Sequence, residues 1–332
     1  MAERKAELLE CPYYQLVFTL PPMFYPLVKE NPELLHKLLL TSVREVLDTL
    51  GRDPTYLGGI PQFLMALHTW NGAMDFHVHV HVLMAAGAYD ETAKRWIPSK
   101  HEDFLFPIGV LSALFRGKFL AGLTKLYGAG RLQMTWPINE ETANPAGWSV
   151  FVDKAYQESF FTYVERTSGG PDNVVEYLGH YLHQTGLADS RIVALDADSV
   201  TYLCKDRKKK ISETGTYPRT QTPAAFVKAY AQHILPKGFH RIRFGGLWST
   251  VLKKRHLADA QAAARRVAPP RPPVDRPPRR ERPPRLPEPC RVCERGTLYL
   301  AVTQVRLGQG GAFLGILHAR GPPAPTSPRS LT

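Results

Sequence analysis

The chain has 332 residues, 44% of them hydrophobic, which is enough for one large domain or two ordinary domains with a buried core. Its 42 Lys and Arg against 30 Asp and Glu give a formal net charge of +12; this is typical of a protein with a polyanionic partner, although a solvated charge excess accounts for it equally well. Four cysteines are too few for a disulfide framework, and no run approaches the roughly 20 apolar residues of a membrane span. We therefore expect a cytoplasmic protein without a membrane partner.

The N-terminal half predicts alternating strands and helices. A strand is expected at 13–20, and a helix should begin at Pro32, with Asn31 as its capping residue, and end near Gly51. Two β-rich segments, 62–70 and 75–84, are separated by Asn71-Gly72 and favour an antiparallel pair. Residues 106–127 are predicted to be helical.

The C-terminal half is less regular. Residues 150–163 are ambiguous, 173–184 favour a helix, 191–205 a hairpin, 222–234 a last helix and 239–248 a strand. Residues 265–289 contain ten prolines and eight arginines, a composition that cannot bury a core. The predicted division is a folded domain at 1–249, a basic linker at 250–289 and a poorly structured tail at 290–332.

One segment, 75–82, alternates histidine with apolar residues without a break. The two-residue period of a strand places His77, His79 and His81 on one face and only apolar side chains on the other, which is the face for a core. Histidines two apart lie roughly 6 to 7 Å from each other, so two imidazoles can converge on one metal ion. His68, on the preceding strand, is a further candidate ligand. An exposed polar face that happens to use histidine is the weaker interpretation.

A second pattern lies in the helix predicted at 173–184. Tyr177 and Tyr181 are four residues apart and share a helix face, about one turn from each other. A tyrosine hydroxyl, with a pKa near about 10, becomes a nucleophile only when a cation or base stabilises the phenolate. Alone, such a pair is more typical of core packing, so a catalytic role depends on the histidine strand.

Together these residues resemble the transposases of the insertion sequence 91 family. His79-Val80-His81 is similar to the His-hydrophobic-His motif of single-strand endonucleases, and Tyr177 with Tyr181 is similar to that family's paired tyrosines. Further short segments resemble the family and occur in the same order along the chain: 17–21, 67–70, 115–120, 177–181 and 233–239. Val78 stands where the family has proline, and because only Cys11 precedes the first strand, the chain resembles a member shortened at its N-terminus.

The resemblance implies an α+β fold in which a central antiparallel sheet carries the histidines and flanking helices include the one with the tyrosines. It implies a rolling-circle transposase that nicks single-stranded DNA at transposon ends through a 5′-phosphotyrosine. Mg²⁺ or Mn²⁺ would be held by His79, His81 and either His77 or His68. The residues expected to contact DNA are Arg116, Lys118, Lys205 and Lys237, and the expected location is the bacterial cytoplasm, associated with the nucleoid.

Two other functions are compatible with the sequence. A decayed transposase would bind DNA without cutting it, as the unusual start and tail allow. A structural zinc protein could be built around Cys290 and Cys293, but such a pair needs two further ligands and only His318 is near in sequence.

Overall fold

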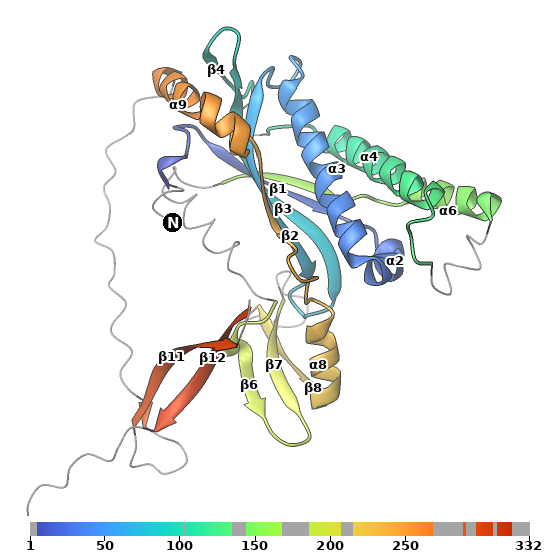
Figure 1. Cartoon of the computed structure of the whole chain (residues 1–332), viewed down its shortest axis with the longest axis vertical. Coiled ribbons are helices and arrows are strands. Elements are labelled where there is room, and N and C mark those ends of the chain that lie inside the picture. Colours follow the sequence, from blue (N-terminus) through green and yellow to red (C-terminus); the bar gives the residue numbers. More distant parts are fainter. Residues whose placement is uncertain are drawn as a thin grey trace, which may run out of the picture. The chain divides into compact units, whose positions relative to one another are not determined.

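The computed structural model of the chain describes residues 5–101, 104–134, 144–167, 186–206, 215–267, 288–289, 297–307 and 311–320. Clustering of contacts divides it into two compact units, Met1–Pro269 and Pro270–Thr332. Figure 1 follows the chain from blue at the N-terminus to red at the C-terminus.

A central antiparallel sheet organises the first unit. Its strands run in the order β5-β1-β3-β2-β9, and β4 also pairs with β3. Their bounds are β1 Tyr13–Thr19, β2 Ile60–Trp70, β3 Phe76–Asp90, β4 Arg95–Pro98, β5 Thr162–Arg166 and β9 Ile242–Gly246. The α+β fold class and the antiparallel pair expected around Asn71-Gly72 are confirmed, with β3 extending six residues beyond the predicted end.

Helices cover one face of this sheet. They are α2 (Tyr25–Glu30), α3 (Pro32–Arg52), α4 (Ile108–Gly128) and α6 (Pro145–Gln157), and α3 and α4 lie side by side in Figure 1. The core beneath them includes the apolar face of β3, where Val78, Val80 and Val82 are at most 1% exposed. The segment that was ambiguous in sequence contains both the end of α6 and the start of β5.

The start of α3 differs from expectation in one respect. Asn31 occupies the N-cap position, but its side chain makes no capping hydrogen bond. Instead its amide nitrogen donates to the carbonyl oxygens of Leu27 and Gln133, and its amide oxygen accepts from the Gln133 backbone N–H. Asn31 therefore fastens the helix to a distant segment, a use that local sequence cannot reveal.

Helix α9 (Thr250–Val267) covers part of the opposite face of the sheet. Ala260, Ala263 and Ala264 pack there in a cluster with Leu83 and Ala85 of β3. These residues were expected to begin the linker, and 222–234 to be the last helix; both expectations are wrong. The buried side of α9 is built largely from alanine among many charges, so it lacks the strong apolar stripe by which helices are recognised.

A smaller sheet completes the first unit. It consists of β6 (Ile192–Leu195), β7 (Val200–Lys205) and β8 (Thr216–Gln221), in that order, followed by α8 (Pro223–Ala231). The hairpin predicted at 191–205 is confirmed by the β6-β7 pairing. Thr222 caps α8 by accepting a hydrogen bond from the Ala225 N–H.

The second unit contains β10 (Glu288–Pro289), β11 (Thr297–Leu307) and β12 (Gly311–Arg320), joined as an antiparallel sheet. Part of the segment expected to be poorly structured therefore forms strands. His318 lies on β12, whereas Cys290 and Cys293 lie outside the described residues. Among the helices that the structure describes, none has the length and apolarity that crossing a membrane requires.

A buried histidine in the core makes stability depend on pH. His36 is 3% exposed, and neither ring nitrogen has a hydrogen-bond partner in the described part of the chain. Burial lowers the pKa of His36 from 6.5 to about 4. The unfolded chain therefore takes up a proton at His36 before the folded chain does, and stability falls as the pH drops from 6.5 towards 4.

We predict that His36→Leu removes this loss. Between about pH 7 and about pH 5, the wild type should lose on the order of 2 kcal/mol of unfolding free energy more than the variant. Urea unfolding at both pH values measures the difference, and the comparison with the variant cancels the titration of the other histidines. Equal losses in the two proteins would contradict a neutral, unpaired His36.

Candidate functional site

Strand register brings three histidines together on the face opposite α3 and α4. On β3, His79 and His81 alternate with the buried valines, and His79 pairs across the sheet with His68 of β2. A register shift follows directly between His68 and Trp70. The apolar sides of both strands are held in the core, so packing on one face fixes the position of the imidazoles on the other.

The three imidazoles form a compact, buried cluster. His68, His79 and His81 are 3%, 8% and 8% exposed, and one potential ligand atom from each lies within 4.8 Å of the others. The Nε2 atoms of His79 and His81 are 3.1 Å apart. Two neighbouring ligands that are each about 2.1 Å from an ion lie about 3.0 to 3.4 Å from one another. The His79–His81 pair therefore has the spacing of two ligands of one metal ion, and His68 is near enough to become a third if it moves inward.

Hydrogen bonds orient two of these rings. His79 Nδ1 lies 2.9 Å from the backbone oxygen of His77, which can only accept, so Nδ1 carries the proton and Nε2 is left as the ligand atom. The amide nitrogen of Gln15 on β1 lies 3.3 Å from His81 Nδ1 and in this orientation donates to it. With the Gln15 amide oxygen turned to His81, Nδ1–H would donate to it and Nε2 would again face the cluster.

His77 is placed differently. Its Nδ1 lies 2.9 Å from the hydroxyl of Tyr25 on α2, and it is not a member of the three-histidine cluster. Burial lowers the pKa of His77 and raises that of Tyr25, so both groups are neutral near pH 7. Of the two residues expected as a third ligand, the structure brings His68 to the pair.

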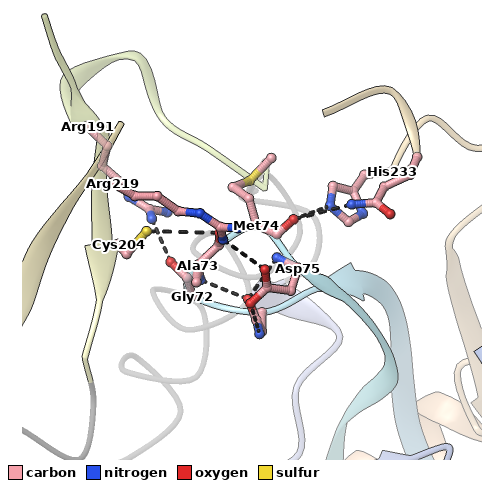
Figure 2. A network of polar contacts seen from close by, with 10 residues as sticks. Gly72, Ala73, Met74, Asp75, Arg191, Cys204, Arg219 and His233 are labelled. Atoms are coloured by element: carbon pink, nitrogen blue, oxygen red, sulfur yellow. Dashed lines mark hydrogen bonds and ion pairs between the residues drawn. The ribbon is translucent and has the colours of Figure 1, made fainter. Parts of the chain in front are cut away.

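The turn between β2 and β3 is clamped by Arg191, which directly precedes β6, and by Arg219 of β8 (Figure 2). Arg191 donates to the Gly72 carbonyl at 2.7 Å, and Arg219 donates to the Ala73 carbonyl at 3.0 Å and to Asp75 at 2.8 Å. Although burial opposes it, hydrogen bonds from Arg219 and from Asn71 lower the pKa of Asp75. The turn is thus fixed by charged groups from outside the hairpin.

The same clamp reaches the chain next to the tyrosines. Tyr177 and Tyr181 lie outside the described residues, which resume at Gly186. Gly186 packs against Trp70 so closely that an added Cβ would lie 3.4 Å from its ring. Trp70 in turn stacks on His68, with ring centroids 4.6 Å apart. Gly186, where the described residues resume, is therefore next to a ring that stacks on the histidine cluster.

The four basic residues expected at DNA occupy different surroundings. Arg116 and Lys118 are on α4, which covers the sheet face opposite the histidines; Arg116 donates to the Tyr156 carbonyl and Lys118 pairs with Glu45. Lys205 ends β7, where its N–H donates to the Gly72 carbonyl, and Lys237 is exposed before β9. The structure thus brings Lys205 to the hairpin turn and leaves Arg116 and Lys118 away from the cluster.

The roles of several residues near the histidine cluster and the hairpin turn could not be predicted from the sequence. Gln15, Tyr25 and Arg219 are each far from the histidines along the chain and belong to no short motif. The alternation of β1 could have identified Gln15 as a residue of the histidine face, but only with the β1-β3 register in hand. Trp70 belongs to the segment 67–70 that resembles the family, but the sequence assigned it no role.

Comparison with known proteins identifies the class. Residues 63–256, which include most of β2, all of β3 and the clamp, match a family model described as "Putative transposase". The chain belongs to this family, and the recognition of a transposase made from its sequence is confirmed.

Two curated relatives are similar to the chain. It is 31% identical over 274 residues to "Putative transposase y4qJ" of Sinorhizobium fredii, covering 79% of this chain and 64% of the relative. It is 25% identical over 264 residues to "Transposase for insertion sequence element IS801" of Pseudomonas savastanoi pv. phaseolicola, covering 78% and 60%. The chain thus spans less than two thirds of either relative. No solved structure matches it significantly.

The geometry distinguishes the two candidates for the third ligand. We predict that His68→Ala weakens Mn²⁺ binding at least about tenfold, since even the outer partners of ligands contribute that much. The matched variant His77→Ala should bind Mn²⁺ within about threefold of the wild type. Calorimetric titration of each purified protein measures this, and the reverse order of effects would make His77 the ligand.

Proposed function

We propose that this chain is the catalytic part of a rolling-circle transposase that nicks single-stranded DNA and transfers strands through a 5′-phosphotyrosine. The observation that carries the proposal is the buried His68–His79–His81 cluster in a member of a transposase family. Soluble proteins rarely bury three imidazoles together unless they share a proton network or a metal, because each buried polar nitrogen must be satisfied.

The three nitrogen donors favour a transition metal. Magnesium prefers oxygen ligands, whereas manganese also accepts imidazole, so Mn²⁺ is the better fit of the two expected ions. His68, His79 and His81 would hold it. When bound, such an ion would polarise the scissile phosphodiester and stabilise the negative charge that develops on its oxygens.

The chemistry at the chain's own residues is an exchange of esters. The hydroxyl oxygen of Tyr177 or Tyr181 attacks phosphorus, the bond from phosphorus to the 3′ oxygen breaks, and the tyrosine remains joined to the 5′ phosphate. The phenolic proton is released and the leaving 3′ oxygen takes one up, so the step balances without another reactant. Because one phosphodiester replaces another, a free 3′ hydroxyl can reverse the step without ATP.

The anchored ends of the tyrosine segment support this assignment. Before it, the Thr167 N–H donates to the Tyr13 carbonyl at 2.9 Å, which holds the chain to β1. After it, Gly186 is held against Trp70. Tyr181 precedes Gly186 by five residues, which span at most about 18 Å when fully extended. In the helix predicted there, they span about 7.5 Å, within reach of the histidine face.

A covalent adduct is the decisive test of the tyrosines. Incubating the protein with a labelled single-stranded transposon end and Mn²⁺ should give a protein–DNA adduct that survives denaturation. Phenylalanine keeps the packing of the ring and removes only the nucleophilic oxygen. Each of Tyr177→Phe and Tyr181→Phe should lose part of the activity, and the double variant should fall by at least about 10³-fold.

Two outcomes would contradict the proposal. An adduct in the double variant would place the nucleophile elsewhere. No adduct from the wild type, with either Mn²⁺ or Mg²⁺ on cognate ends, would make the chain a transposase remnant that only binds DNA.

The histidines are tested separately by His79→Ala with His81→Ala. The double variant should lose metal-dependent nicking, while its unfolding free energy stays within about 2 kcal/mol of the wild type because the valine face still packs. Gel analysis of nicked DNA and a urea titration measure the two quantities. Nicking at the wild-type rate would rule out a catalytic metal at this cluster.

A further inference from the structure

A continuous row of aromatic rings and cations crosses the end of the β2-β3 hairpin beside the histidine cluster. We call it the hairpin strip, and it consists of Arg241, Trp70, His233, Phe76 and Lys29. Neighbouring members are in contact throughout: the Arg241 guanidinium is 5.9 Å from the Trp70 centroid, His233 is 6.1 Å from Trp70 and 6.2 Å from Phe76, and Lys29 Nζ is 4.7 Å from the Phe76 centroid.

The strip is joined to the cluster directly at Trp70 and, through Tyr25, to the neighbouring His77. Trp70 stacks on His68, and Tyr25, whose ring is 5.4 Å from Phe76, reaches the His77 imidazole with its hydroxyl. A ligand on the strip would therefore continue directly to the metal-binding histidines.

The exposure and charge of the strip differ from those of a core. Its three aromatic rings are only partly buried, Arg241 is partly buried and Lys29 is exposed. No carboxylate in the described part of the chain forms an ion pair with Lys29, in contrast to Lys37 and Arg44 of α3, which pair with Glu33 and Asp48. Positive charge next to aromatic rings is the combination that proteins use to hold the phosphates and bases of single strands.

His233 fixes the middle of the strip. Its Nε2–H donates to the Met74 carbonyl at 3.1 Å, and its Nδ1 lies 3.2 Å from the Thr69 hydroxyl, so both ring nitrogens are engaged by the hairpin (Figure 2 shows the Met74 contact). Burial, with a smaller contribution from the charge of Lys29, lowers the pKa of His233. The ring is thus neutral near pH 7 and held in place, which keeps Trp70 and Phe76 at a fixed separation.

We propose that the hairpin strip binds the single-stranded DNA that flanks the scissile phosphate, with Lys29 and Arg241 contacting phosphates and the partly exposed rings contacting bases. The identity of the ligand as DNA rests on the proposed function. The assignment replaces α4 with the hairpin end as the DNA-contacting surface, because Arg116 and Lys118 contact Tyr156 and Glu45 rather than the hairpin end.

The test is binding without cleavage. The full chain in metal-free buffer with EDTA is titrated into a fluorescein-labelled oligothymidylate of about 16 nucleotides, and anisotropy is measured over a range of salt concentrations. Lys29→Gln with Arg241→Gln should weaken binding at least about tenfold and reduce the slope of log K against log salt by about 1.4, because each lost single-strand phosphate contact removes about 0.7.

The matched control is Lys37→Gln with Arg44→Gln. It removes two positive charges from the exposed side of α3, where their partners are Glu33 and Asp48 rather than members of the strip, so only the general electrostatic contribution should change. Binding and slope should stay close to those of the wild type. Equal losses in the two double variants would overturn the strip as a specific contact.

Tryptophan fluorescence gives an independent measurement. Trp96, Trp148 and Trp248 are 4%, 5% and 3% exposed, whereas Trp70 is partly exposed. In a Trp136→Phe background, which removes the tryptophan that lies outside the described residues, DNA should therefore quench the emission. Adding Trp70→Phe, which keeps a ring against His68, should remove most of that quenching. Undiminished quenching in this variant would place the DNA elsewhere.

These outcomes separate the two proposals. Normal oligothymidylate binding by Lys29→Gln with Arg241→Gln would overturn the strip even if the wild type forms the tyrosine adduct. Conversely, a strip that binds DNA as expected in a protein that forms no adduct would support a DNA-binding remnant and leave the strip assignment standing.

Discussion

The arrangement of the site depends on the two-residue period of β3 and on the burial of one of its faces. Val78, Val80 and Val82 are locked into the core under α3 and α4, and a slip of one residue would move them to the histidine side of the sheet and place the histidines among apolar side chains. The cost of such a slip fixes the register with both neighbours. His79 therefore lies opposite His68, and the cluster follows from packing on the other side of the sheet.

The alternation of β3 and the hairpin before it were predictable because both are local patterns. The choice of His68 over His77 was not, since it requires the pairing of β2 with β3 and the irregularity beside Trp70. Helix α9 escaped prediction because alanines form its buried side, and Asn31 resembles a helix cap yet bonds to Gln133, 102 residues away. The features that could not be predicted from the sequence are contacts between segments that are far apart along the chain.

The hairpin turn illustrates how a local strain is stabilised from a distance. Met74 adopts a left-handed φ of 67°, which is unfavourable for a residue with a side chain. It persists because Met74 is buried in the small core of the second sheet and its carbonyl accepts from His233, while Arg219 and Arg191 hold the preceding carbonyls. Loosening this clamp would disturb both Trp70 and Gly186, because Arg191 also donates to the Gly186 carbonyl.

The hydrogen bond that orients the His79 imidazole also determines which mutations can alter its tautomer. Its acceptor is a main-chain oxygen, which every amino acid at position 77 would supply, so no substitution of residue 77 removes it while the strand remains. His81 relies instead on the side chain of Gln15. One imidazole of the cluster thus has its tautomer guaranteed by the backbone, and the other has a tautomer that selection can adjust through one residue of β1, independently of the ligands themselves.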